Sequence, residues 1–448
     1  MTSRLTSIGN EVSRRRSRAR RFAAFLAVPA LTAALPAAAL DYTIGAGYTL
    51  ETTDNVGRTT DNEVSDLINI PQVQASVSHL TSQFELDANY RFERRIYVED
   101  LFQDRTRLTG SAQVAWHAIP ERLRLNVSNS RTEATIQSLA QDIENNRQLT
   151  TVTSVGPVLS LRPRPSDRFN LEYRFSDVTE EETDSDSERQ LFRIGYVAGL
   201  SANRNIGIEA SRDSVEFEAD FAPSLDINNA SVTYNSRSEL LDVQLKAGYS
   251  NIERSLGADD LNAFVGNLSV NWTPTGGSSF NVLLRRTLSD QSENLLRGTG
   301  QFGQGSVIDN SELNDVFTED TVRASYTLSS PRNSVTLAFS LQNQDYEDDF
   351  VLRDEDETGF SVNVQRRVTP RITAGASIEF VERDFLALGV KDDFVLGGAN
   401  VRWQLSRKTL VRANVGWEER DSSRSDLGFS QFVGRIGFIY NLVDRQQR

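Results

Sequence analysis

The chain has 448 residues, no Cys, one Met and a formal charge of −14. Only 38 % of its residues are hydrophobic, and no apolar run is long enough for a helical membrane span, which excludes that class of membrane protein. The lack of Cys excludes disulfides, iron–sulfur clusters and thiol catalysis.

The first 39 residues differ from the rest. Seven Arg and one Glu precede or border a short apolar stretch, residues 22–35, and Ala37, Ala38 and Ala39 follow it. A basic region, a short apolar core and a small-residue cleavage site are typical of a secretory signal peptide. An N-terminal membrane helix is the alternative, but the apolar core is too short to span. We therefore predict a signal peptide over residues 1–39 and one domain over residues 40–448.

From residue 40 onward, apolar and polar residues alternate. Between Phe84 and Val98, the even positions are almost all apolar and the odd positions almost all charged or strongly polar. A strand with one face in hydrocarbon and the other in water requires this pattern. The alternation recurs often enough to predict about 20 strands, within a range of 18–22. Further examples, in chain order, are 42–50, 108–116, 169–175, 192–200, 230–234, 243–249, 264–272, 322–328, 335–341, 360–364, 372–380, 401–405, 411–417 and 432–442.

The connections between these strands alternate in length. Long, acidic connections separate short ones, several of which contain Pro. The short connections are expected near 79–83, 117–121, 162–168, 201–205, 236–240, 273–279, 329–333, 369–371 and 406–409. This asymmetry is the signature of an all-β, transmembrane, antiparallel up-and-down β-barrel of the bacterial outer membrane, with both termini on the periplasmic side. A soluble β-sandwich or β-helix also alternates, but this loop asymmetry does not favour it.

Two further features favour the barrel. All four Trp (Trp116, Trp272, Trp403 and Trp417) occupy alternate strand positions whose side chains are expected on the apolar face. They also lie near strand ends, where an interfacial aromatic girdle belongs. The last predicted strand resembles the signal read by the barrel assembly machinery. The residues that carry this resemblance are Arg435, Gly437, Tyr440 and Leu442.

The sequence gives little support for catalysis, and we predict that the protein is not an enzyme. Its two His, His79 and His117, fall at predicted periplasmic turns, and no metal spacing, phosphate loop or dinucleotide motif is present. No cofactor or nucleic-acid partner is expected. The long acidic connections, such as 177–188 and 345–357, are interpreted as solvated loops, with binding of Ca²⁺ or Mg²⁺ as the alternative.

Basic residues recur on the face predicted to line the lumen. They are Arg91, Arg95, Arg107, Arg124, Arg174, Arg193, Lys246, Arg285, Arg323, Arg367, Arg402, Arg412 and Arg435. Inward acids are expected as well: Glu85, Asp87, Glu93, Glu172, Glu209, Asp213 and Glu379. One interpretation is a channel that guides a polyanion or a polar sugar chain. The other is a salt-bridge network that fills and stiffens the barrel. The sequence leaves both open.

Two other expectations concern the wall and the mouth. Arg94, Arg212 and Arg286 have lipid-facing parity near the extracellular ends, where they would meet lipopolysaccharide phosphates, unless a register error or a bulge explains them. A barrel this wide cannot be filled by side chains alone. We expect the Gly-containing connection 289–320 to fold inward and gate it, its acids pairing with wall residues such as Arg285 and Arg323.

The opening hairpin also carries a family resemblance. Gly45-Ala46-Gly47-Tyr48, Asp54-Asn55-Val56, Asp61-Asn62-Glu63, Ser65-Asp66 and Pro71 resemble the start of the outer-membrane β-barrel porin 2 family, which includes EpsL-like barrels associated with exopolysaccharide operons. The resemblance implies a part in polysaccharide export and no catalytic residues.

Three functions are therefore carried forward. The first is export of an exopolysaccharide across the outer membrane. The second is diffusion of small polar or anionic solutes, and the third is a structural surface barrel whose acidic loops bind a polymer. Expected partners are outer-membrane lipid and lipopolysaccharide, the barrel assembly machinery, and possible polysaccharide export proteins with their secreted polymer.

Overall fold

A computed structural model describes residues 40–137, 139–183, 186–218, 222–255, 259–290, 315–346 and 354–445. The predicted signal peptide, 1–39, lies outside the described residues. No helix in the described ranges is long and apolar enough to cross a membrane.

The described chain forms twenty strands and one short 3-10 helix, η2 (Glu144–Asn146). The strands are β1 Asp41–Thr53, β2 Asp66–Leu80, β3 Phe84–Tyr97, β4 Arg105–Ile119, β5 Leu123–Thr135, β6 Arg147–Leu161, β7 Arg168–Glu180, β8 Ser187–Ser201, β9 Arg204–Phe217, β10 Leu225–Arg237, β11 Leu241–Arg254, β12 Leu261–Thr275, β13 Ser278–Asp290, β14 Val316–Ser329, β15 Asn333–Tyr346, β16 Glu355–Thr369, β17 Ile372–Phe385, β18 Val390–Gln404, β19 Thr409–Ser422 and β20 Phe429–Arg445.

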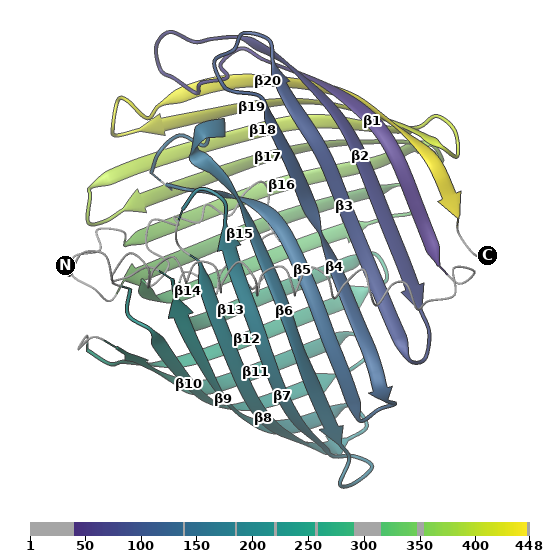
Figure 1. Ribbon diagram of the computed structural model, residues 1–448, viewed down its shortest axis with the longest axis vertical. Coiled ribbons are helices and arrows are strands. Elements are labelled where there is room, and N and C mark those ends of the chain that lie inside the picture. Colours follow the sequence, from purple (N-terminus) through teal and green to yellow (C-terminus); the bar gives the residue numbers. More distant parts are fainter. Residues whose placement is uncertain are drawn as a thin grey trace, which may run out of the picture.

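Each strand pairs antiparallel with its neighbours in sequence, and β1 pairs with β20, so the sheet closes on itself. Figure 1 shows the result, a barrel whose front wall (β3 to β8) runs obliquely across its back wall (β14 to β19). The predicted up-and-down β-barrel of about 20 strands is confirmed. Closure leaves no free sheet edge, which is what a sheet in lipid requires.

The two ends of the barrel differ in their connections. At one end, β1 begins and β20 finishes, and the predicted short connections all lie there, such as 81–83, 276–277 and 370–371. We call this the short-turn end. At the other end, the long-loop end, the connections are mostly longer, such as 54–65 and 136–146. His79 and His117 lie within the last residues of β2 and β4, slightly before the turns in which the sequence placed them.

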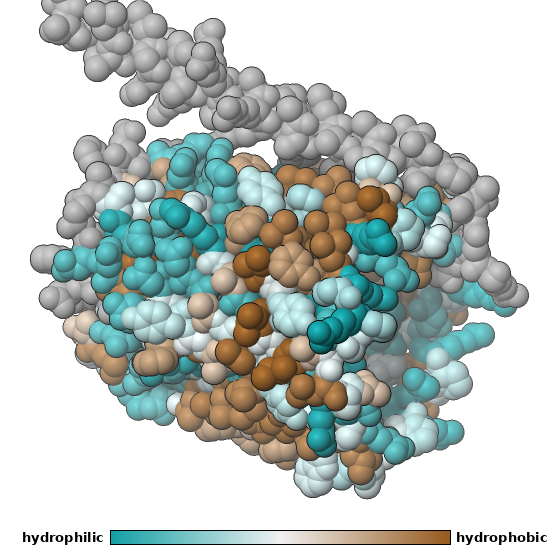
Figure 2. All heavy atoms as spheres, turned by 90° about the horizontal axis from the view of Figure 1, so that it is seen from below, coloured by the Kyte–Doolittle hydropathy of each residue, from teal (hydrophilic) through white to brown (hydrophobic). Residues whose placement is uncertain are grey.

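The outer face is apolar. Large apolar side chains are exposed on nearly every strand, including Phe92, Phe264 and Val415. Trp116, Trp272 and Trp403 are also exposed and lie close to the short-turn ends of their strands. In Figure 2, apolar side chains gather across the middle of the face in view, with more polar ones beside them. An apolar belt with aromatic side chains near its border matches a hydrocarbon layer.

The seam between β1 and β20 requires small residues. A Cβ on Gly437 would lie 2.6 Å from Thr49 Oγ1, and one on Gly47 would lie 2.7 Å from the Phe438 carbonyl oxygen. In the predicted assembly signal, Arg435 and Gly437 face the lumen, whereas Tyr440 and Leu442 are exposed on the outer face. The strand continues beyond Leu442 and stays paired with β1 through Arg445.

Candidate functional site in the barrel lumen

The strand ladders place all the predicted lumen-facing basic residues on the inner face. Most of them alternate with apolar residues of the outer face, as Arg193 does with Phe192 and Ile194, and Arg402 does with Val401 and Trp403. Inward-facing cations in a wall with an apolar outer face are the arrangement that period-two alternation predicts. Whether each of these cations stabilises the wall or is available to a ligand depends on whether an acidic side chain lies within ion-pair distance.

One group of these cations is ion-paired. Arg95 and Arg435 both contact Glu51, at 2.9 and 2.7 Å. Arg193 contacts Glu172 at 3.2 Å. The remaining pairs are Arg107 with Glu133 and Glu144, Lys246 with Glu209, and Arg285 with Glu319. Arg323 has an interaction of its own as well. This group matches the interpretation in which inner charges stiffen the wall.

A second group has no ion pair within the described part of the chain. It consists of Arg91, Arg124, Arg174, Arg367, Arg402 and Arg412. Arg91, Arg402 and Arg412 are also exposed to the space inside the barrel. An uncompensated guanidinium that faces water-filled space remains charged and available to an anion. The described part of the lumen therefore contains both ion-paired cations and cations without an acid partner.

The connection 136–146 contacts the inner wall on one side of the long-loop end. Pairing between β4 and β5 stops at Gly110 and Arg131, whereas β5 stays paired with β6 as far as Thr135 and Arg147, so the tip of the β5–β6 hairpin separates from β4 here. Glu144 then lies among Arg105, Arg107 and Arg95, and Tyr97 donates its hydroxyl to Glu144 at 2.7 Å.

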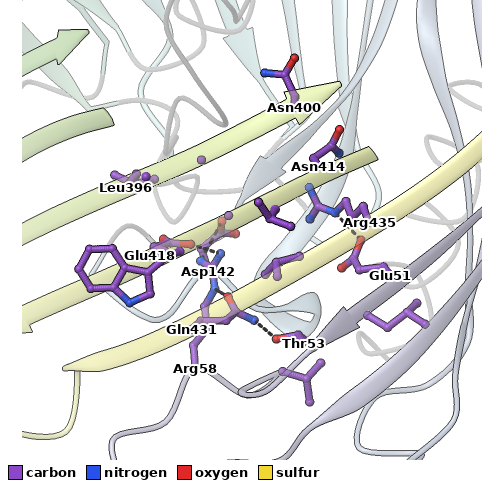
Figure 3. A pocket seen from close by; sticks show the side chains of 18 of the residues that line it. Glu51, Thr53, Arg58, Asp142, Leu396, Asn400, Asn414, Glu418, Gln431 and Arg435 are labelled. Carbon is purple, nitrogen blue, oxygen red and sulfur yellow. Dashed lines mark hydrogen bonds and ion pairs between the residues drawn. The ribbon is translucent and has the colours of Figure 1, made fainter. Parts of the chain in front are cut away.

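The same connection also reaches strands on the far side of the β1–β20 seam. Asp142 contacts Arg58 at 3.4 Å, and Arg58 in turn contacts Glu418 of β19 at 2.8 Å. Gln141 Nε2 donates to the Asp426 carbonyl at 3.0 Å, and an Arg420 guanidinium donates to the Leu139 carbonyl at 3.1 Å. Figure 3 shows Arg58, Asp142 and Glu418 meeting inside the barrel, beside Gln431 and Thr53. We call residues 136–146 the inward loop.

Both acids of the inward loop are held in the charged form. Burial by itself would raise the pKa of the Glu144 carboxyl, but the Arg107 charge and the Tyr97 hydroxyl bring that pKa below its usual value. Burial would likewise raise the pKa of Asp142, and the Arg147 hydrogen bond and the Arg147 and Arg58 charges lower it. The loop is therefore attached by ionised carboxylates at neutral pH.

A second segment bends over the lumen from the opposite wall. Leu288 and Asp290 lie an even number of residues after the outward-facing Leu284, so alternation along β13 would place their side chains on the outer face. Asp290 nevertheless contacts the inward-facing, buried Arg189 of β8 at 3.0 Å. Leu288 and Val316 pack against Val215, Ile227 and Ile252, all on inner faces. The outer face of the β13–β14 hairpin thus lies against the inner face of β8–β11 at this end, which is possible only if the hairpin leans inward.

This hairpin is the base of the connection that the sequence predicts as the gate. Residues 291–314 of that connection lie outside the described residues. Its described flank contains Glu319, which pairs with Arg285 as the sequence suggested for an acid of this segment. The inward loop was not anticipated. Its only sequence signal is a pair of acids, Asp142 and Glu144, in a connection that is otherwise uncharged.

Below the inward loop the lumen holds two adjoining cavities. The larger, about 670 Å³, is lined by residues of both walls, among them Glu51, Asn400, Arg402, Asn414 and Arg435. The smaller, about 450 Å³, includes Arg91 and Arg107, and Arg412 lines both. A third space of about 490 Å³ lies at the short-turn end, bordered by Arg122, Arg124, Arg162 and Arg168. Basic side chains therefore border all three spaces, accompanied by acids such as Glu172 and Glu209 in the third.

The three outward-facing Arg are each neutralised by an Asp. Arg94 contacts Asp104 at 3.0 Å, Arg212 contacts Asp226 at 2.9 Å, and Arg286 lies 3.7 Å from Asp320. All three pairs lie toward the long-loop end and are substantially exposed. The structure assigns these Arg a partner from the chain itself, and their parity reflects no register error or bulge.

The fold and the lumen define a transmembrane β-barrel of the outer-membrane type. The FrpB iron transporter from Neisseria meningitidis has a similar fold, with a TM-score of 0.50 over 89 % of this chain and 81 % of that one, at 8 % identity. Looser matches include the siderophore receptor PirA from Pseudomonas aeruginosa (TM-score 0.45, 10 % identity, 90 % and 81 % covered) and OccK2 from the same organism (0.41, 8 %, 90 % and 98 %). No protein-family model and no curated protein sequence matches this chain. At 8 % identity, the match to the iron transporter shows a similar fold and nothing about cargo.

Proposed function

We propose that the protein is an outer-membrane channel through which an anionic exopolysaccharide leaves the cell. The short-turn end would face the periplasm and the long-loop end the exterior, as in other barrels of this construction. The observation that supports this function is the group of unpaired inner Arg, above all Arg91, Arg402 and Arg412.

The charge pattern favours passage of an anion over a purely structural barrel. Pairing every inner cation with an acid would stiffen the wall, and much of the long-loop end is built in that way. Two cations near the short-turn end, Arg402 and Arg412, are left without acids, although like charges facing each other across strands are unfavourable. Arg402 and Arg412 are direct cross-strand partners. A mobile polyanion would supply the missing countercharge as it passes.

The two inward-leaning segments favour a gated channel. The inward loop is attached to both walls by polar contacts and ion pairs, which can be broken and remade more easily than a packed apolar core. A polymer moving outward would compete for Arg95, Arg107 and Arg58 with the carboxylates of the loop. Closure at rest would keep small solutes from leaking through a wide barrel.

The proposal is tested by deletion of the gene followed by measurements of surface polysaccharide and of small-solute uptake. Loss of the polymer with normal uptake is expected, together with accumulation of polymer in the periplasm. Complementation by the intact chain, and its failure with a triple Arg91→Gln, Arg402→Gln, Arg412→Gln variant, would link the defect to the inner cations. Normal polymer secretion in the deletion strain would refute the proposal.

Diffusion of small anions is the second candidate. It is favoured by the cavity volumes of about 670 and 450 Å³, which lie in the range typical of small-molecule sites. This function predicts steady open conductance and a nutrient-uptake defect in the deletion strain, with the polysaccharide unaffected.

A further inference from the structure

On the inner face of the barrel, β18 and β19 carry three successive cross-strand pairs of identical residues, which we call rungs. Gly398 lies opposite Gly416, Asn400 opposite Asn414, and Arg402 opposite Arg412. Identical residues therefore face each other at each level, and the order runs from glycine through amide to guanidinium toward the short-turn end. Successive rungs on one face are about 7 Å apart, because a strand rises about 3.4 Å per residue.

All of the polar side chains in this set are unsatisfied by the protein. Asn400 and Asn414 make no side-chain hydrogen bond, and Arg402 and Arg412 make no ion pair, within the described residues. The four are exposed to the lumen and line the larger cavity. Arg91 of β3 reaches the adjoining cavity that Arg412 also lines. Figure 3 shows Asn400 and Asn414 on neighbouring strands of the same wall.

We propose that these rungs form a binding subsite for a carboxylated sugar residue, such as a hexuronate unit of an acidic polysaccharide. A pyranose ring would lie over the amide rung, with open space beside it where Gly398 and Gly416 present no side chains. Its hydroxyls would reach the amides of Asn400 and Asn414, which both donate and accept hydrogen bonds. Its carboxylate would lie between the guanidinium groups of Arg402 and Arg412, each able to bind it in a bidentate manner.

The spacing suits this ligand better than a bare anion. A sugar ring carries its carboxylate on one side and its hydroxyls on the other, and the amide and guanidinium rungs lie about 7 Å apart. A simple phosphate or sulfate could use only the arginine rung. The inference rests on the proposed function in that it names the chemistry of the exported polymer, but the subsite can be tested apart from secretion.

The test is equilibrium binding of trigalacturonate to the purified full-length barrel in detergent, with maltotriose as the neutral ligand and inorganic phosphate as the bare anion. Trigalacturonate should bind and maltotriose should not. Arg402→Gln with Arg412→Gln should weaken trigalacturonate binding by about ten- to a hundredfold, the effect of losing charge-assisted hydrogen bonds. Asn400→Ala with Asn414→Ala should weaken it about fivefold or more and leave phosphate binding unchanged.

Arg212→Gln with Arg286→Gln is the matched control, because it removes the same charge from Arg of the outer face, outside the lumen. It should leave trigalacturonate affinity within about twofold of the intact protein. Folding is checked by heat-modifiable gel migration, which the Arg402 and Arg412 changes should preserve because they relieve a like-charge contact. Equal weakening by the control pair, equal affinity for phosphate, or no binding by the intact barrel would overturn the subsite. A secretion defect without binding would leave the export function standing and remove only this inference.

Discussion

Arginines are used in two ways along the lumen. Toward the long-loop end, Arg95, Arg107 and Arg58 are held by Glu51, Glu144 and Glu418, and a loop is attached through them. Nearer the short-turn end, Arg402 and Arg412 face each other without an acid. The same residue type thus serves as an anchor in one region and as a free charge in the other. The presence of acids within reach makes the difference, and each region can be altered separately.

The largest expected effect comes from releasing the inward loop. Glu144→Gln with Asp142→Asn removes both carboxylates and leaves Arg95, Arg107 and Arg58 with fewer counterions. Breaking a buried ion pair costs about 3–5 kcal/mol, which shifts the loop about a hundredfold to a few thousandfold toward the undocked state. Single-channel conductance in planar bilayers should rise sharply. Glu181→Gln, which breaks an exposed pair with Arg131 at the same end, is the control and should not change it. Unchanged conductance in the double variant would mean that the loop does not close the channel.

Acid should act on the same contacts. The pKa values of Asp142 and Glu144 are both lowered when the loop is docked. A group whose pKa is depressed in the docked state stabilises that state above its ordinary pKa and loses the contribution as pH falls through the depressed value. The loop should therefore stay docked from pH 7 to about 5 and be released below about pH 4. Conductance measured against pH checks this, and opening between pH 6 and 7 would contradict it.

Ion selectivity should separate paired from unpaired cations. Arg124→Gln with Arg174→Gln removes two uncompensated charges, so the preference for anions in reversal-potential measurements should fall. Lys246→Gln with Glu209→Gln removes a whole ion pair, whose atoms lie 2.9 Å apart, and leaves the net charge unchanged. The second variant should keep the selectivity of the intact channel. A similar loss in both would show that pairing does not decide which cations act on permeating ions.

The smallest effect is expected on the outer face. Arg212→Ala breaks the exposed pair with Asp226, and such pairs contribute about 0–1 kcal/mol. Urea unfolding in lipid vesicles should therefore change little. If the loss exceeds this range in vesicles that contain lipopolysaccharide and stays small without it, then lipopolysaccharide binds Arg212 in spite of its Asp partner.

Much of the architecture could be read from the sequence because its signals are local. The alternation from Phe84 to Val98 defines β3 by itself, and the position of the short connections gives the up-and-down order. Parity likewise places Arg402 and Arg412 inward, and the short turn 405–408 brings them opposite each other. That pair could have been recognised from the sequence as an unusual like-charge contact.

Docking of the inward loop could not be read in the same way. Its contacts join residues from distant parts of the chain, as between Leu139 and Arg420 or Gln141 and Asp426. The alternation along a strand predicts which face of the sheet a side chain lies on. It does not predict which loop crosses the lumen to contact that side chain. The inward lean of the β13–β14 hairpin could not be predicted either. Alternation along β13 places Asp290 on the outer face, whereas in the structure its side chain contacts the inner face of β8.

The seam between β1 and β20 has a consequence for how the molecule is made. Strands β2 to β19 have both partners next to them in the sequence, whereas β1, which pairs with β2 on one side, meets its other partner only when β20 is in place. Until then β1 presents an unpaired edge, the kind of edge that recruits foreign strands and leads to aggregation. Loss of a few C-terminal residues would prolong that exposure more than the same loss from any loop. Timing of the last step in biogenesis thus depends on the 17 residues of β20.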